Sequence, residues 1–159
     1  MTRRPPSLRA IRALQRRQRF GLWKYLAGAD AATALSAPII YSLLLAFAML
    51  DLWVTLYQAI CFRAWRVKRV RRRDFFAIDR HRLPYLNGLE KVNCLYCSYA
   101  NGVIAYVREI AARTEQYWCP IRHARRVRGS HERYDLFVPY GDAPAYRTRQ
   151  AGLRQLIKR

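Results

Sequence analysis

A run of apolar residues in the first half of the chain constrains the fold more than any other feature. Residues 38–62 read PIIYSLLLAFAMLDLWVTLYQAICF; they contain no Lys or Arg, and only Asp51 and Gln58 interrupt the run strongly. A helix needs about 20 apolar residues to cross a bilayer core. A chain of 159 residues has too little other apolar material to surround such a helix. We therefore expect a membrane-embedded segment over residues 37–62.

Basic residues flank this run on both sides. Residues 1–36 carry eight basic residues and one acid, and residues 63–159 carry 22 basic and eight acidic residues. Cytoplasmic flanks of membrane helices are rich in Lys and Arg. The tighter cluster follows the run directly, so we expect an inner (cytoplasmic) membrane location with the C-terminal part facing the cytoplasm. A single span is favoured, and a re-entrant hairpin that breaks at Pro38 is the alternative.

The N-terminal arm has the pattern of a short basic amphipathic helix. Leu8, Ile11 and Leu14 recur every three residues, and arginines occupy another side. Such a helix suits an anionic membrane surface, with nucleic acid as the weaker alternative partner. The residues expected to contact lipid headgroups are Arg9, Arg12, Arg16, Arg19, Arg63, Arg66, Lys68 and Arg69.

Asp51 places a carboxylate within the apolar run. Carrying this group into a bilayer costs a few kcal/mol on insertion scales, so it needs an explanation. We expect a polar contact to a partner helix, most simply in another membrane protein. A protonated carboxyl that the apolar helix tolerates, or a proton or ion relay, remain the alternatives.

Three cysteines and one histidine in the second half have the residue types of a metal site. Cys94 and Cys97 form a CxxC pair, and Cys119 and His123 follow. Zn²⁺ binds four such ligands in a tetrahedron, and a closed Cys₃His site is structural rather than catalytic. We predict zinc at these four residues. The alternatives are an iron–sulfur cluster, a dithiol redox pair, and packed cysteines without metal.

The region around these residues is expected to form three helices, over residues 83–101, 103–118 and 120–128. Asn101 and Gly102 give a turn signal, and Pro120 is suited to open a helix. Glu109 and Arg113 are expected to pair at i,i+4. A simple hairpin leaves Cys119 about 12 Å from Cys94, which weighs against the metal site.

The sequence therefore predicts an all-α protein with one membrane-embedded or re-entrant helix followed by a small cytoplasmic helical domain. No P-loop, dinucleotide or Ser/His/Asp signature occurs, so a non-enzymatic binding or accessory module is favoured. A membrane-bound redox or electron-transfer accessory protein is the alternative. The expected divisions are an N-terminal arm (residues 1–36), the membrane segment (37–62), a Cys/His helical domain (63–132) and an irregular basic tail (133–159).

Overall fold

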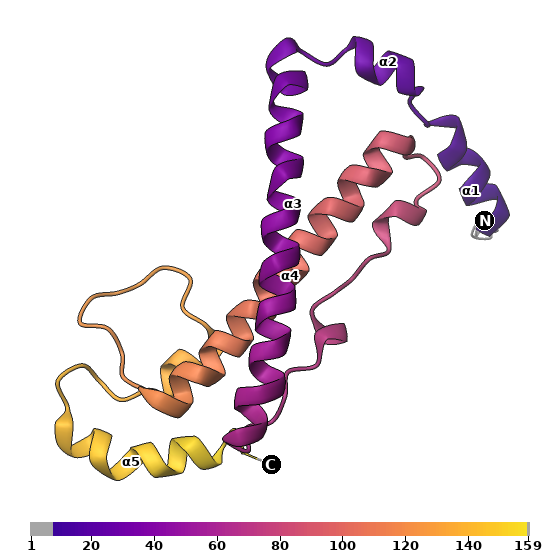
Figure 1. The fold of residues 1–159 in the computed structure, drawn as a ribbon. Helices are drawn as coiled ribbons and strands as arrows, with labels where there is room; N and C mark the ends of the chain where they lie inside the picture. The colour runs from indigo at the N-terminus through magenta and orange to yellow at the C-terminus, as the bar shows by residue number, and fades with distance from the viewer. Residues whose placement is uncertain (1–7, 159) are drawn as a thin grey trace, which may run out of the picture. The chain divides into compact units, whose positions relative to one another are not determined.

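The computed structural model describes residues 8–158, and their regular secondary structure is helical, with two isolated β-bridges and no strand (Figure 1). The all-helical prediction is confirmed. The chain divides into unit 1, comprising Met1–Ala46 and Phe76–Asn101, and unit 2, comprising Phe47–Phe75 and Gly102–Arg159. The elements are α1 (Leu8–Arg17), α2 (Leu22–Ala27), α3 (Ala31–Tyr57), η1 (Gln58–Phe62), η2 (Arg72–Asp74), η3 (Arg80–Arg82), α4 (Gly88–Trp118), η4 (Glu132–Leu136) and α5 (Ala143–Gln155).

The apolar run forms α3, which continues without interruption into the π-helical turn η1. The Asp30 carboxylate caps the start of α3 by accepting a hydrogen bond of 2.6 Å from the Thr33 amide. Among the described residues, Ala31–Phe62 is the one helix that is long and apolar enough to cross a membrane. Pro38 lies inside α3 and the helix continues through it. The expectation of a break at Pro38, on which the re-entrant alternative depended, is therefore wrong.

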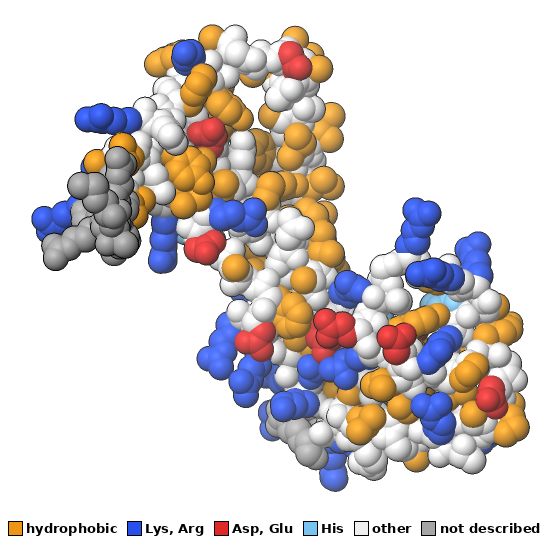
Figure 2. All heavy atoms as spheres, turned by 180° about the vertical axis from the view of Figure 1, so that it is seen from behind, with side chains coloured by type: hydrophobic (Ala, Val, Ile, Leu, Met, Phe, Trp, Pro, Cys, Tyr) orange, Lys and Arg blue, Asp and Glu red, His pale blue; other side chains and the backbone are white. Residues whose placement is uncertain are grey.

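α3 presents large apolar side chains to its surroundings along its whole length. Hydrophobic side chains cover its upper part in Figure 2. Those that are most exposed recur at spacings that place them on one side of the helix: Leu35, Ile39, Leu45, Met49, Leu52, Trp53 and Ile60. Soluble monomers rarely expose a continuous apolar surface of this length.

The end of the long helix is a Schellman motif built on an unusual residue. The Val67 amide donates to the Phe62 carbonyl at 2.8 Å, and the Arg66 amide donates to the Arg63 carbonyl at 3.2 Å. This pattern places Arg66 at the position where glycine is usual, with φ of 58°. Phe62 and Val67 are both buried, which supplies the hydrophobic contact of the motif. The motif turns the chain sharply after α3.

Unit 1 contains α1, α2, η3 and the N-terminal parts of α3 and α4. Tyr41 of α3 hydrogen-bonds the Asn93 side chain and packs edge-on against Tyr96 at 5.8 Å. α4 begins with a capping box in which Asn87 and Glu90 exchange side-chain to backbone hydrogen bonds of 2.8 and 3.0 Å. The expected start at residue 83 is therefore replaced by a start at Gly88.

Unit 2 has a small buried core from both halves of the chain. Its fully buried side chains include Phe62, Tyr106, Ile110, Phe137 and Val138. The carbonyl of Pro120 accepts from the Val138 amide at 2.9 Å, and the Arg122 amide donates back to Val138 at 2.8 Å. These bonds hold the segment after α4 in an extended bridge, so the expected helix over residues 120–128 is absent.

Two further expectations about this region are wrong. α4 is a single helix of 31 residues that passes through Asn101 and Gly102, so the hairpin predicted there does not form. The C-terminal region expected to be irregular contains η4 and α5, the latter capped by the Asp142 side chain. The Glu109–Arg113 pair within α4 is confirmed, with a separation of 2.7 Å between Nε and Oε1.

Candidate anion-binding surface

Four cationic residues of the described chain line a concave surface in unit 2. Its lining residues are Lys68, Arg69 and Arg71, from the segment that leaves α3, and Lys158, from the C-terminal end of the described chain. The hollow has a volume of about 600 Å³. We call these four residues the basic cleft. Lys and Arg side chains gather over the lower part of the view in Figure 2.

Backbone pairing between two distant segments builds the basic cleft. Val67 and Lys158 form an isolated antiparallel bridge, and the Lys68 amide donates to the Ile157 carbonyl at 2.8 Å. Val67 and Ile157 are buried, so the bridge has an apolar inner side. Arg113 of α4 also donates to the Lys68 carbonyl at 2.5 Å. The fold therefore holds the backbones of Lys68 and Lys158 side by side.

None of the described acidic residues lines the basic cleft. Asp51 is buried and its Oδ2 lies 2.5 Å from an Arg72 guanidinium nitrogen. Glu109 accepts hydrogen bonds from Arg113 and Arg133. Asp51 thus pairs with an arginine of the same chain in η2, and the expected contact with a partner helix stays a prediction.

An aromatic cluster lies at the end of α3 in unit 2. The Trp65 ring stacks on Tyr117 with centroids 5.2 Å apart and an interplanar angle of 12°, and it meets Trp118 edge-on at 5.3 Å. Arg154 of α5 covers the Tyr117 ring at 5.1 Å. Trp118 remains half exposed. Tryptophan and tyrosine with one apolar and one wet side are typical of membrane–water interfaces.

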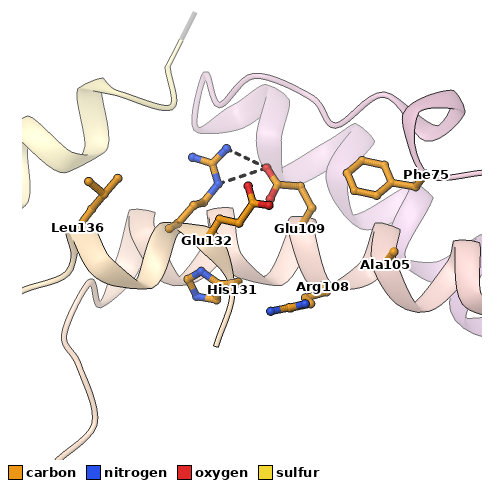
Figure 3. A pocket seen from close by; sticks show the side chains of 8 residues that line it. Phe75, Ala105, Arg108, Glu109, His131, Glu132 and Leu136 are labelled. Atoms are coloured by element: carbon orange, nitrogen blue, oxygen red, sulfur yellow. Dashed lines mark hydrogen bonds and ion pairs between the residues drawn. The ribbon is translucent and has the colours of Figure 1, made fainter. Parts of the chain in front are cut away.

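A second hollow of unit 2, of about 550 Å³, carries both signs of charge (Figure 3). Arg133 donates to Glu109 with two guanidinium nitrogens, at 2.8 and 3.2 Å. Burial raises the pKa of Glu109. The hydrogen bonds and charges of Arg133 and Arg113 together lower it by more than burial raises it, so the pKa of Glu109 lies below the ordinary value. Because its charges compensate one another, this hollow has the character of a structural network.

His131 lies beside the same network. Its Nε2 is 2.9 Å from Glu115 Oε2, and its ring packs against Tyr134 and Phe137. The His131 side chain is largely covered. The pair connects the segment before η4 to α4.

The four predicted metal ligands are not brought together. Cys94 and Cys97 lie one turn apart in α4, whereas Cys119 follows the last residue of the same helix. Because α4 is continuous, about six turns of helix separate Cys97 from Cys119. His123 contacts Tyr134 through both its backbone amide and its ring. Within residues 8–158, no group of three or more His, Cys, Asp or Glu side chains is placed to hold a metal ion.

The structure places the basic residues that were predicted to contact lipid in two parts of the chain. Arg9, Arg12 and Arg16 lie exposed on α1, and Arg19 follows that helix. The remaining four, also exposed, lie after η1: Arg63, Arg66, Lys68 and Arg69. The basic cleft unites the last two with Arg71 and Lys158.

Sequence reasoning missed Lys158 as a site residue. The available signal was the apolar pattern of Leu153 and Ile157 in the tail, which indicated a segment that packs. Both side chains are buried in the structure, and their burial positions Lys158.

Comparison of the chain with protein-family models, with curated proteins and with solved structures finds no match.

Proposed function

We propose that this chain is a membrane-anchored binding module. In this proposal α3 is embedded in the bilayer, and the part of unit 2 outside α3 lies at a membrane surface that carries anionic lipid. The observation that carries the proposal is the exposed apolar side of α3, from Leu35 to Ile60, followed directly by the basic segment that forms the cleft. Apolar surface of this extent is stable in hydrocarbon, and Lys and Arg next to it favour anionic headgroups.

The ion pair between Asp51 and Arg72 supports this proposal. A carboxylate within a membrane helix is costly, and pairing with a cation lowers that cost. Arg72 lies half exposed, so it reaches back from a solvated segment to the helix. The aromatic cluster around Trp65 adds an interfacial anchor at the same end of α3.

The orientation proposed is the one that the basic segment after α3 favours, with unit 2 on the cytoplasmic side. The exposed apolar side of α3 also fits a helix of another membrane protein, since lipid and apolar helices offer similar surfaces. Neither zinc nor an iron–sulfur cluster forms part of the proposal, because no geometry in the described residues supports one.

Alkaline carbonate extraction of membranes from cells that express the full chain tests the anchor. We expect the protein to stay in the membrane pellet. The double variant Leu45→Arg/Met49→Arg puts two charges on the exposed apolar side and is expected to shift most of the protein to the supernatant, since each charge costs about 2.5–3.5 kcal/mol. Val127→Arg, at an exposed loop position, is the control and is expected to remain in the pellet.

A wild-type chain that carbonate releases fully would refute membrane embedding. The orientation is tested separately by a cytoplasm-active reporter fused to the C-terminus. Activity of a reporter that works only on the far side of the membrane would reverse the proposed orientation.

A further inference from the structure

We propose that the basic cleft binds the phosphate group of one anionic membrane lipid, such as phosphatidylglycerol. This inference rests on the proposed function, because it needs unit 2 to lie at a lipid surface. It goes further by assigning a defined site of four residues: Lys68, Arg69, Arg71 and Lys158.

Charge is the first argument for a ligand in the basic cleft. Four like charges line one hollow, and no described carboxylate lines it. Like charges held close together repel, so the fold accepts this arrangement at a cost that a bound anion offsets. Two guanidinium forks and two ammonium groups present many donors, and this set matches the oxygens of a phosphate.

Construction of the cleft is the second argument. The pairing of Val67 with Lys158 and the bond from Lys68 to Ile157 fix both walls through the backbone. Lys158 is about 90 positions from Lys68 in the sequence. A hollow whose walls are fixed before binding loses less conformational freedom when the ligand enters, which favours a discrete site over a diffuse basic surface.

The position of the cleft in the chain favours lipid over nucleic acid. Lys68 follows the Schellman turn that ends the long helix after η1, and Trp65 of the aromatic cluster lies within that turn. A membrane-embedded α3 therefore brings the start of the cleft to headgroup depth. Nucleic acid contacts usually extend along a basic stripe that tracks the backbone, whereas this hollow is compact.

Native mass spectrometry of the full chain in neutral-detergent micelles tests the assignment. The probes are phosphatidylglycerol, phosphatidylcholine, inorganic phosphate and a 20-nucleotide RNA. We expect one phosphatidylglycerol retained per chain, with at least about tenfold weaker retention of phosphatidylcholine. The variant Arg69→Gln/Lys158→Gln is expected to retain phosphatidylglycerol at least about tenfold more weakly than the wild type, because two phosphate contacts are removed.

The matched control is Arg125→Gln/Arg147→Gln, which removes the same two charges at exposed positions outside the cleft. We expect it to retain the lipid. Equal loss in both double variants would show attraction to net charge and would overturn the proposal. Equal retention of phosphatidylcholine would do the same. Retention of inorganic phosphate that is tighter than retention of phosphatidylglycerol would also overturn it. So would RNA binding that depends on the cleft residues together with lipid binding that does not.

Circular dichroism checks that each variant is folded, and Arg71→Gln provides the same test if the double variant unfolds. Carbonate extraction separates this proposal from the anchor. A cleft variant that stays in the membrane and loses no lipid refutes the cleft alone, whereas release of the wild type refutes the anchor.

Discussion

Glu109→Gln tests whether the charged network of unit 2 holds the unit together. Glu109 Oε1 accepts from Arg113 Nε at 2.7 Å and from Arg133 at 2.8 and 3.2 Å. Arg113 continues to the Lys68 carbonyl, and Arg133 continues to the Gln116 side chain at 3.1 Å. One carboxylate therefore links α4, η4 and the segment after α3.

The magnitude follows from these contacts. A hydrogen bond to a charged group contributes about 1.5–3 kcal/mol when buried. Glu109 is 21% exposed and its two arginines 16% and 26%, so solvent screens part of each bond. The glutamine keeps one carbonyl acceptor but removes the charge. We therefore expect the free energy of unfolding to fall by about 2 kcal/mol at pH 7.

The pH dependence has a definite sign. The folded-state pKa of Glu109 lies below its ordinary value, so its stabilising effect is fully present above the unfolded pKa of about 4.3. The effect disappears as the pH falls through the lowered folded-state pKa. The difference between wild type and Glu109→Gln should therefore be constant from neutral pH to about pH 5 and shrink in more acidic solution.

Urea unfolding of the full chain in neutral-detergent micelles, followed by tryptophan fluorescence between pH 3 and 7, measures both quantities. Glu132→Gln is the matched control, because Glu132 lines the same hollow but is exposed (Figure 3). Its effect should stay within about 0.5 kcal/mol. Equal destabilisation of the two variants, or a Glu109→Gln effect that is as large at pH 3 as at pH 7, would refute the reasoning.

Three further changes test other parts of the fold. Arg66→Gly should raise the free energy of unfolding by about 1 kcal/mol in the same urea assay, because the left-handed backbone there favours glycine; a decrease would contradict the Schellman assignment. Gln116→Leu should lower it by about 2–4 kcal/mol, because this fully buried amide donates to the Leu153 carbonyl and accepts from an arginine; a loss below 0.5 kcal/mol would contradict that role. Cys94→Ser/Cys97→Ser should change it by less than about 1 kcal/mol, since no metal group includes them; one zinc per chain by elemental analysis, lost in this variant, would restore the predicted site.

Local sequence signals predicted the features that depend on a few neighbouring residues. The apolar run predicted the long helix α3, the three-residue spacing of apolar residues predicted α1, and i,i+4 spacing predicted the Glu109–Arg113 pair. These features depend on helical periodicity, which sequence displays directly. The sequence also supplied the cations of the segment after α3, though not the way they are arranged.

The errors arose where burial outweighed a local signal. Asn101 and Gly102 indicate a turn, yet glycine in a helix costs only about 1 kcal/mol. Ala100 and Val103 beside them are buried, and the Asn101 side chain satisfies the Cys97 carbonyl at 2.8 Å, so the helix continues. The metal prediction rested on residue types alone, and the single helix keeps Cys97 and Cys119 about six turns apart.

The sequence by itself determined that the chain is helical, that it contains a helix fit for a membrane, and that basic residues follow that helix. Only the tertiary structure decided which distant residues meet. Asp51 pairs with Arg72, and Lys158 joins Lys68, because the chain turns back after α3 and buried residues such as Ile157 fix its end. Contacts between residues far apart in sequence depend on how apolar surfaces pack together, and no periodicity within a single segment records that packing.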